Sequence, residues 1–117
     1  MAIYQNLSVA DAKQLIAEQQ PVILDCRAMK DYRNGHIDDA LHVHEQLRDS
    51  LIRRGDKHKP LLIYCYHGHA SQHLAETFSD FGFQQVYSLI GGYTDWIKSA
   101  DQHQAQQALD GFATGNY

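Results

Sequence analysis

Residues 60–71 read PLLIYCYHGHAS. The run that follows Pro60 is unbroken and apolar, which is typical of a strand buried on both faces of a parallel sheet. A helical pattern begins at Ser71, so the loop between them joins the carboxyl end of a strand to a helix amino terminus. Loop amides and the positive end of a helix dipole both stabilise an anion. The sequence therefore predicts that Cys65, which opens this loop, ionises readily and acts as a nucleophile.

Short apolar runs alternate with helical patterns along the rest of the chain. Strands are predicted at residues 22–24, 40–43, 60–65 and 86–89. Helices are predicted from the cap Ser8 to Pro21 and at residues 29–34, 45–54, 71–81 and 93–98. This alternation is typical of an α/β domain. We therefore expect a mainly parallel central sheet that is flanked by helices on both faces.

The length of 117 residues suits one domain with one hydrophobic core. We assign this domain to residues 1–100, because no linker or internal repeat divides them. The composition then changes, since residues 101–117 are rich in Gln and Ala and end in a loose, glycine-containing stretch. They are predicted to form a polar C-terminal tail that is partly helical or disordered.

Charge and hydropathy exclude several classes of partner. The formal net charge of -4 and the lack of a long Lys/Arg run argue against nucleic acid. No apolar stretch approaches the length of about 20 residues that a membrane helix needs. The amino terminus lacks the basic and then apolar pattern of a signal peptide. We therefore expect a cytoplasmic protein without a membrane partner, in which Cys26 and Cys65 stay reduced.

Three segments fall at the carboxyl ends of predicted strands, where open α/β folds place their ligand sites. They are residues 25–27, the loop from Cys65 and residues 90–92. Asp25 and Arg27 are expected to make structural contacts near the site, with the guanidinium bonded to carboxylates or loop carbonyls. Cys26 lies between them, so its side chain should point to the opposite face of the strand. On that face, a packing role for Cys26 is favoured over a role as a resolving thiol.

Four segments, taken in order, resemble the single-domain rhodanese family of sulfurtransferases. They are Asp25-Cys26-Arg27, YRNGHI at residues 32–37, the loop from Cys65, and GGYTDW at residues 91–96. Each segment is weak alone, but their order and spacing make the resemblance specific. It spans Leu7 to Lys98, and CYHG at residues 65–68 is particularly similar to the small bacterial thiosulfate sulfurtransferases of the glycerol-utilisation regulon type. The resemblance implies a rhodanese-like α/β fold.

The resemblance also implies a reaction. The Cys65 thiolate attacks the outer sulfur of thiosulfate, sulfite leaves, and a Cys65 persulfide remains. A thiophilic acceptor then removes the sulfur, either cyanide or a dithiol such as a thioredoxin-like protein. No metal or organic cofactor is implied, and we expect a monomer or weak homodimer. The expected substrate-binding groups belong to the loop residues Tyr66, His67, Gly68, His69, Ala70 and Ser71.

The loop departs from the commoner family pattern because it contains no Arg or Lys. Many relatives place such a residue there to attract the dianionic sulfur donor. Here His67 and His69 add positive charge only when they are protonated. Thiosulfate binding is therefore expected to strengthen as pH falls through the imidazole titration, until loss of the thiolate opposes it. The alternative is that both histidines are ordinary solvent-facing residues, and a pH profile of the Michaelis constant that His69→Ala leaves unchanged would exclude the role of His69.

Other functions compete with sulfur transfer as interpretations of this sequence. Phosphatases of the same fold need Cys-x5-Arg, in which the Arg clamps the phosphate oxygens, whereas Ser71 occupies that position here. A metal bound by Cys65, His67 and His69 is disfavoured, because alternate residues of a curled loop rarely converge. A persulfide relay fed by another protein and a non-catalytic docking module remain as alternatives, although an intact Cys65 argues against the module.

Overall fold

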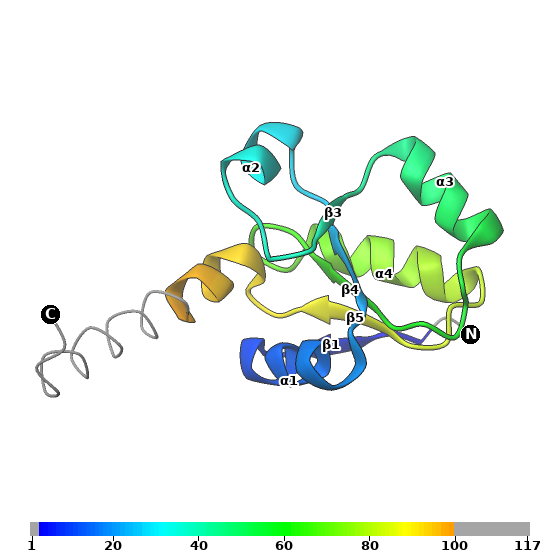
Figure 1. The fold of residues 1–117 in the computed structure, drawn as a ribbon, viewed down its shortest axis with the longest axis horizontal. Coiled ribbons are helices and arrows are strands. Elements are labelled where there is room, and N and C mark those ends of the chain that lie inside the picture. Colours follow the sequence, from blue (N-terminus) through cyan, green and yellow to red (C-terminus); the bar gives the residue numbers. More distant parts are fainter. Residues whose placement is uncertain (1–2, 100–117) are drawn as a thin grey trace, which may run out of the picture.

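The computed structural model describes residues 3–99, which form a five-stranded sheet covered by helices (Figure 1). The strands are β1 (Gln5–Leu7), β2 (Val22–Asp25), β3 (Leu41–His42), β4 (Leu61–Tyr64) and β5 (Val86–Leu89). The helices are α1 (Val9–Gln19), α2 (Met29–Asn34), α3 (Glu45–Arg54) and α4 (Ala70–Asp80), followed by a last helical segment at residues 92–99. All neighbouring strands pair in parallel, in the order β1-β5-β4-β2-β3. The predicted α/β class with a mainly parallel sheet is confirmed.

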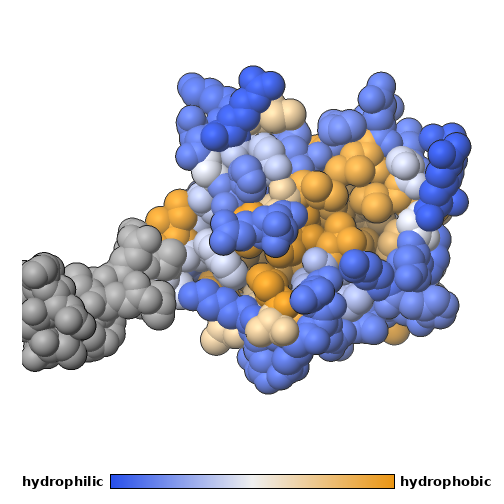
Figure 2. All heavy atoms as spheres, in the orientation of Figure 1, coloured by the Kyte–Doolittle hydropathy of each residue, from blue (hydrophilic) through white to orange (hydrophobic). Residues whose placement is uncertain are grey.

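Helices cover both faces of the sheet, as predicted. Along β4, Leu62 and Tyr64 belong to the apolar cluster that includes α1, whereas Leu61 and Ile63 belong to the cluster that includes α3 and α4. This alternation follows the two-residue period of a strand. Trp96, from the last helical segment, packs against the first cluster. We call the two sides the α1 face and the α4 face, and Figure 2 shows apolar side chains gathered on the side that carries α3 and α4.

The ends of the helices follow local sequence signals. The Oγ atom of Ser8 accepts a hydrogen bond of 3.1 Å from the N–H of Asp11, so Ser8 caps α1 as predicted. A cap of this kind typically stabilises a helix by about 1 kcal/mol. Helix α4 begins at Ala70 and ends at Asp80, one residue earlier at each end than the apolar pattern predicted. The loop after Cys65 is therefore short and leads directly into the first turn of α4.

The sequence pattern did not predict β1. This strand lies at the edge of the sheet, where it pairs with β5, and Gln5 and Asn6 are exposed. A short edge strand is held by main-chain hydrogen bonds to its neighbour and does not need an apolar run. Because periodicity detects buried faces, a three-residue polar strand leaves no signal for it.

Parallel pairing brings the carboxyl ends of β2, β4 and β5 to the same edge of the sheet. Asp25, the last residue of β2, pairs with Tyr64, the last residue of β4. The segments that follow these strands therefore meet, as the sequence predicted. Within residues 3–99, no helix is both long and apolar enough to cross a membrane. The predicted tail at residues 101–117 lies outside the described part of the chain.

Candidate active site

The thiol of Cys65 lies at the amino-terminal end of α4. Its Sγ atom accepts hydrogen bonds from the N–H groups of Gly68 (3.2 Å) and Ser71 (3.4 Å), and it lies 3.4 Å from the Oγ atom of Ser71. Cys65 is only 5% exposed. The eleven-residue helix α4 adds the positive end of its dipole on the same side. This arrangement favours negative charge at the sulfur and in the loop beyond it.

Two glycines allow the loop to close around the sulfur. Gly68 has a φ of +96°, in the left-handed region that glycine adopts without strain. Gly92 has a φ of +61°, and a Cβ atom there would lie 2.5 Å from the carbonyl oxygens of Cys65 and Tyr66. The N–H of Tyr93 then donates a 2.8 Å hydrogen bond to the Cys65 carbonyl. The start of the last helical segment is thus fastened directly to the loop.

Two buried serines lie beneath the thiol. The Oγ atoms of Ser71 and Ser88 are 2.8 Å apart, and neither residue is exposed to solvent. Ser88 comes from β5, on the strand next to the one that leads into Cys65. If Ser88 donates to Ser71, the Ser71 hydroxyl is free to donate to an ionised Cys65. Ser71 is among the residues predicted from the sequence and Ser88 is not, although a serine inside an apolar strand is itself a signal of a buried polar contact.

Cys26 is a neighbour of Cys65. Its N–H donates to the carbonyl of Tyr64 at 2.9 Å, and its Sγ atom lies 3.3 Å from the same oxygen and beside the sulfur of Cys65, so its single S–H proton can be donated to either acceptor. Cys26 lies on the face opposite Asp25 and Arg27, as strand alternation predicted, because it packs against the α4-face cluster. The sequence alone did not predict that the sulfur of Cys65 lies on the same face of the sheet.

These contacts decide which cysteine is ionised. The hydrogen bond with Cys26 is the largest influence on Cys65 and lowers its pKa. Burial opposes this effect, but the hydroxyl of Ser71 and the N–H groups of Ser71 and Gly68 reinforce it, so the pKa falls from an ordinary 9.0 to about 4. The same hydrogen bond raises the pKa of Cys26, together with burial and the negative charge of Cys65. At neutral pH Cys65 is therefore the thiolate and Cys26 the thiol.

We expect Ser71→Ala to raise the pKa of Cys65, because the variant removes a hydroxyl that donates to the thiolate. Alkylation of Cys65 by iodoacetamide follows the thiolate fraction, which is full above the pKa and falls as pH drops through it. The acidic limb of the rate should move to higher pH by about one unit, as expected for one hydrogen bond to a charged group. Mass spectrometry of the Cys65 peptide measures this rate separately from alkylation of Cys26.

Ser88→Ala provides the matched control, because it breaks the same serine pair without removing a contact of Cys65. Its acidic limb should shift less than that of Ser71→Ala. Equal shifts in both variants would show that disturbance of the serine pair, and not the lost donor, changes the pKa.

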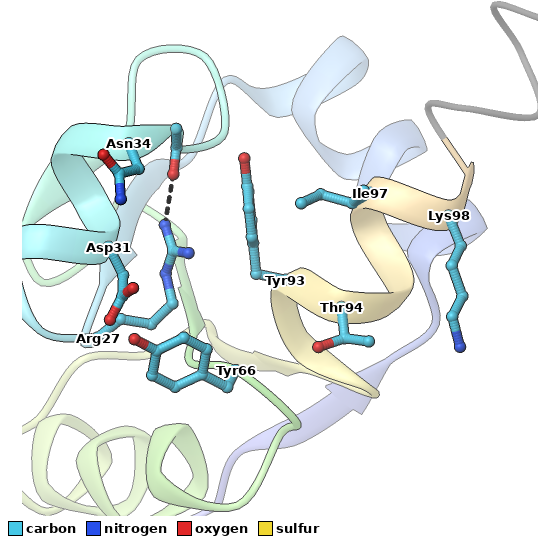
Figure 3. Close-up of a pocket in the computed structure, with 9 residues that line it drawn as sticks. Arg27, Asp31, Asn34, Tyr66, Tyr93, Thr94, Ile97 and Lys98 are labelled. Atoms are coloured by element: carbon cyan, nitrogen blue, oxygen red, sulfur yellow. Dashed lines mark hydrogen bonds between the residues drawn. The ribbon is translucent and has the colours of Figure 1, made fainter.

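Asp25 and Arg27 form an ion pair on the α1 face, across the sheet from the reactive sulfur. The Nη2 atom of Arg27 lies 2.7 Å from Oδ2 of Asp25, and its Nε atom lies 3.1 Å from both carboxylate oxygens. Nη2 also donates to the carbonyl of Gly35 at 2.7 Å (Figure 3). The guanidinium carbon is 4.0 Å from the ring centroid of Tyr93 and 5.6 Å from that of Tyr66. Arg27 thus supports the loop through Tyr66 and does not touch the sulfur.

A cavity of about 500 Å³ adjoins this ion pair. Figure 3 shows side chains that line it: Asp31 and Asn34 from α2, Tyr66 from the loop, and Thr94 and Ile97 from the last helical segment. Cys65 does not line the cavity, which reaches the loop only through the half-exposed ring of Tyr66. The cavity therefore borders the candidate site without containing its nucleophile.

The loop histidines lie at the surface. His67 and His69 are exposed, and neither imidazole hydrogen-bonds to the sulfur of Cys65. The Nδ1 atom of His67 lies 3.4 Å from Oγ1 of Thr94. His69 occupies the N-cap position of α4 without a side-chain capping bond. In the described part of the chain, no three His, Cys, Asp or Glu side chains are grouped so that they could hold a metal ion.

The sequence of this chain matches a known protein family. Residues 8–99 match the rhodanese-like domain. The chain belongs to that family. A thiosulfate sulfurtransferase GlpE of Coxiella burnetii is 39% identical to this rhodanese over 94 residues, which cover 80% of the chain and 88% of the relative. The GlpE of Shewanella oneidensis is 35% identical over 96 residues, which cover 82% of the chain and 95% of the relative.

Solved structures share the fold of this rhodanese. The human single-domain sulfurtransferase TSTD1 matches with a TM-score of 0.70 and 16% identity, covering 80% of this chain and 95% of that protein. A Rhodopseudomonas palustris protein of unknown function, described as a possible tyrosine phosphatase, matches with a TM-score of 0.72 and 24% identity, covering 83% and 82%. At these identities the likeness shows a common fold and leaves the chemistry to the residues of the site.

Proposed function

We propose that this rhodanese is a thiosulfate sulfurtransferase that carries sulfur as a persulfide on Cys65. The observation that supports this most directly is that the Sγ atom of Cys65 accepts hydrogen bonds from the N–H groups of Gly68 and Ser71, which favour its thiolate. Relatives that are 39% and 35% identical to this chain over 94 and 96 residues carry the name thiosulfate sulfurtransferase. The chain aligns with most of the length of each, so the proposal concerns the whole activity.

In the first half of the reaction, the Cys65 thiolate attacks the outer sulfur of thiosulfate. A bond forms between Sγ and that sulfur, the sulfur–sulfur bond of thiosulfate breaks, and sulfite leaves with the bonding electrons. The outer sulfur of the persulfide then carries negative charge. Among residues 3–99, the N–H groups of Tyr66, His67, His69 and Ala70 have no hydrogen-bond acceptor. They are the donors that we assign to the charged sulfur and to the sulfite oxygens.

In the second half, a thiophilic acceptor attacks the outer sulfur and restores the Cys65 thiolate. Cyanide would leave as thiocyanate, whereas a dithiol would take the sulfur as its own persulfide. The lowered pKa of Cys65 makes its thiolate a good leaving group in this step. We assign the cellular role to a reduced dithiol, such as a thioredoxin-like protein in the cytoplasm, where thiols are kept reduced.

The exposed imidazoles of His67 and His69 are assigned to attraction of the dianionic donor. Their position at the mouth of the loop suits long-range attraction better than direct contact with the sulfur.

The same site lacks what phosphate transfer requires. The position at which phosphatases of this fold place their clamping arginine is Ser71, and its side chain is buried against Ser88. Arg27, which lies nearby in the fold, is already bonded to Asp25 and to the Gly35 carbonyl. In the described part of the chain, Arg27 is therefore not free to make the bidentate contact that stabilises a phosphoryl group in transfer.

Sulfite release under single-turnover conditions tests the proposal. The protein is mixed with thiosulfate in the absence of an acceptor, and released sulfite is measured beside the intact mass. We expect one sulfite for each chain and a gain of sulfur that peptide mapping places on Cys65. Cyanide should then remove this sulfur as thiocyanate.

Two results would contradict the proposal. If the protein releases no sulfite from thiosulfate, thiosulfate is not its sulfur donor. If the protein gains sulfur only from another protein's persulfide, the domain is a relay. Hydrolysis of an aryl phosphate at a rate comparable with sulfite release would assign it to the phosphatases.

A further inference from the structure

We propose that Cys26 is a resolving thiol, which attacks a persulfidated Cys65, closes a disulfide with it and releases the transferred sulfur as hydrosulfide. The inference rests on the persulfide of the proposed function and assigns it a second fate. It arises from the position of Cys26, which is an intact thiol beside the nucleophile and whose own sulfur forms no bond in the transfer reaction.

The backbone sets the two cysteines at disulfide distance. Asp25 of β2 pairs with Tyr64 of β4 in parallel register, and the N–H of Cys26 continues this register with a 2.9 Å bond to the Tyr64 carbonyl. Cys26 and Cys65 are the next residues along the two strands. Neighbouring strands lie about 4.8 Å apart. This spacing falls within the range of about 4.4–6.8 Å that separates the Cα atoms of a disulfide.

The side chains also share one face of the sheet. Leu24 and Ile63, each two residues before one of the cysteines, both belong to the α4-face cluster. Strand alternation therefore turns Cys26 and Cys65 to that same face. The thiol of Cys26 packs against the cluster and hydrogen-bonds to Cys65. Both requirements of a disulfide, distance and direction, are met without movement of either strand.

Loading of Cys65 with sulfur changes the electrostatics of the pair. Before loading, the charged Sγ of Cys65 accepts a hydrogen bond from Cys26 and keeps it protonated and unreactive. After loading, the negative charge lies on the outer sulfur, closer to the N–H groups of the loop. The Sγ atom of Cys65 is then a neutral, electrophilic sulfur in contact with Cys26. The persulfide thus removes the interaction that held Cys26 inactive.

The step balances without another reactant. A bond forms between the two Sγ atoms, and the bond from Cys65 to its outer sulfur breaks. The outer sulfur leaves with the electron pair and takes the proton of Cys26, so it departs as hydrosulfide. The sulfur of Cys26 loses one electron and the outer sulfur gains one, while the Sγ atom of Cys65 exchanges one sulfur partner for another and keeps its oxidation state. A dithiol reductant must then reopen the disulfide by thiol–disulfide exchange before another turnover.

The lifetime of the persulfide tests the inference. Wild-type protein and Cys26→Ser are loaded anaerobically with thiosulfate and no acceptor, and intact mass and hydrosulfide are followed over time. Serine keeps a hydrogen-bond donor beside Cys65 but offers no sulfur. We expect the wild type to lose the added sulfur on the order of 100-fold faster than Cys26→Ser, since an aligned intramolecular thiol acts at high effective concentration. It should then weigh two hydrogens less than the reduced protein and release one hydrosulfide for each chain.

A second arm keeps this test separate from that of the proposed function. Inorganic polysulfide loads a thiolate with sulfur without any cleavage of thiosulfate, so it serves if thiosulfate is not the donor. Cys26→Ala repeats the comparison in case Cys26→Ser folds poorly. Failure to release sulfite from thiosulfate would overturn the proposed function alone. A wild-type persulfide that persists as long as that of the variants, with either donor, would overturn the role of Cys26.

Discussion

Replacement of Cys65 by serine is expected to reduce sulfite release from thiosulfate by at least about 10³-fold, the scale on which enzymes lose rate when their nucleophile is removed. The serine oxygen would occupy nearly the same place, within reach of the N–H groups of Gly68 and Ser71. It would remain protonated at neutral pH, however, and it cannot form the sulfur–sulfur bond that holds the transferred atom. Single-turnover sulfite release and intact mass measure the loss.

Thermal unfolding of Cys65→Ser separates lost chemistry from a lost fold. Because serine is slightly smaller and can keep the hydrogen bonds of the loop, the melting temperature should stay within a few degrees of the wild type. A folded Cys65→Ser variant that still gained sulfur from thiosulfate would show that Cys65 is not the point of attachment. In that case Cys26, the other free thiol in the described part of the chain, would become the candidate.

The parts of this site that could be predicted from the sequence are those determined by residues close together in the chain. The buried strand before Cys65, the tight turn at Gly68 and the helix that follows are each encoded by neighbouring residues. The position of Arg27 as a bracket also followed from its residue type, and its bonds to Asp25 and to the Gly35 carbonyl have that form. Strand β1 escaped prediction because an exposed edge strand needs no apolar run.

The contacts that could not be predicted from the sequence depend on the register between strands. Alternation along β2 correctly turned Cys26 away from Asp25 and Arg27. Whether Cys26 or Asp25 then lies on the face of Cys65 depends on how β2 and β4 are aligned, and a single sequence does not contain that alignment. The serine pair has the same origin, since Ser71 and Ser88 come from elements that only the folded sheet brings together. The hydrogen bonds that lower the pKa of Cys65 are therefore partly local and partly a product of topology.

Arg27→Met is expected to lower the free energy of unfolding by about 3–5 kcal/mol, the usual cost of removing one partner of a buried ion pair. Both side chains of the pair are almost completely buried, with 3% exposure for Arg27 and none for Asp25. Methionine fills much of the space between the tyrosine rings but leaves a carboxylate without its cation. A domain of this size has only about 5–15 kcal/mol of stability, so the loss is a large share of the total. Urea unfolding followed by circular dichroism measures it.

The double variant Asp25→Asn/Arg27→Met identifies the cause of this loss. Its asparagine can still accept the hydrogen bond that Asp25 receives from the main-chain N–H of residue 27, but it carries no charge. If the stranded carboxylate is responsible, the double variant should regain more than half of the stability that Arg27→Met loses. Arg27→Lys should fall between them, because an ammonium group keeps the charge but cannot reach the carboxylate and the Gly35 carbonyl together as a planar guanidinium does. Equal losses in the single and double variants would instead assign the effect to packing against Tyr93 and Tyr66, with the ion pair contributing little.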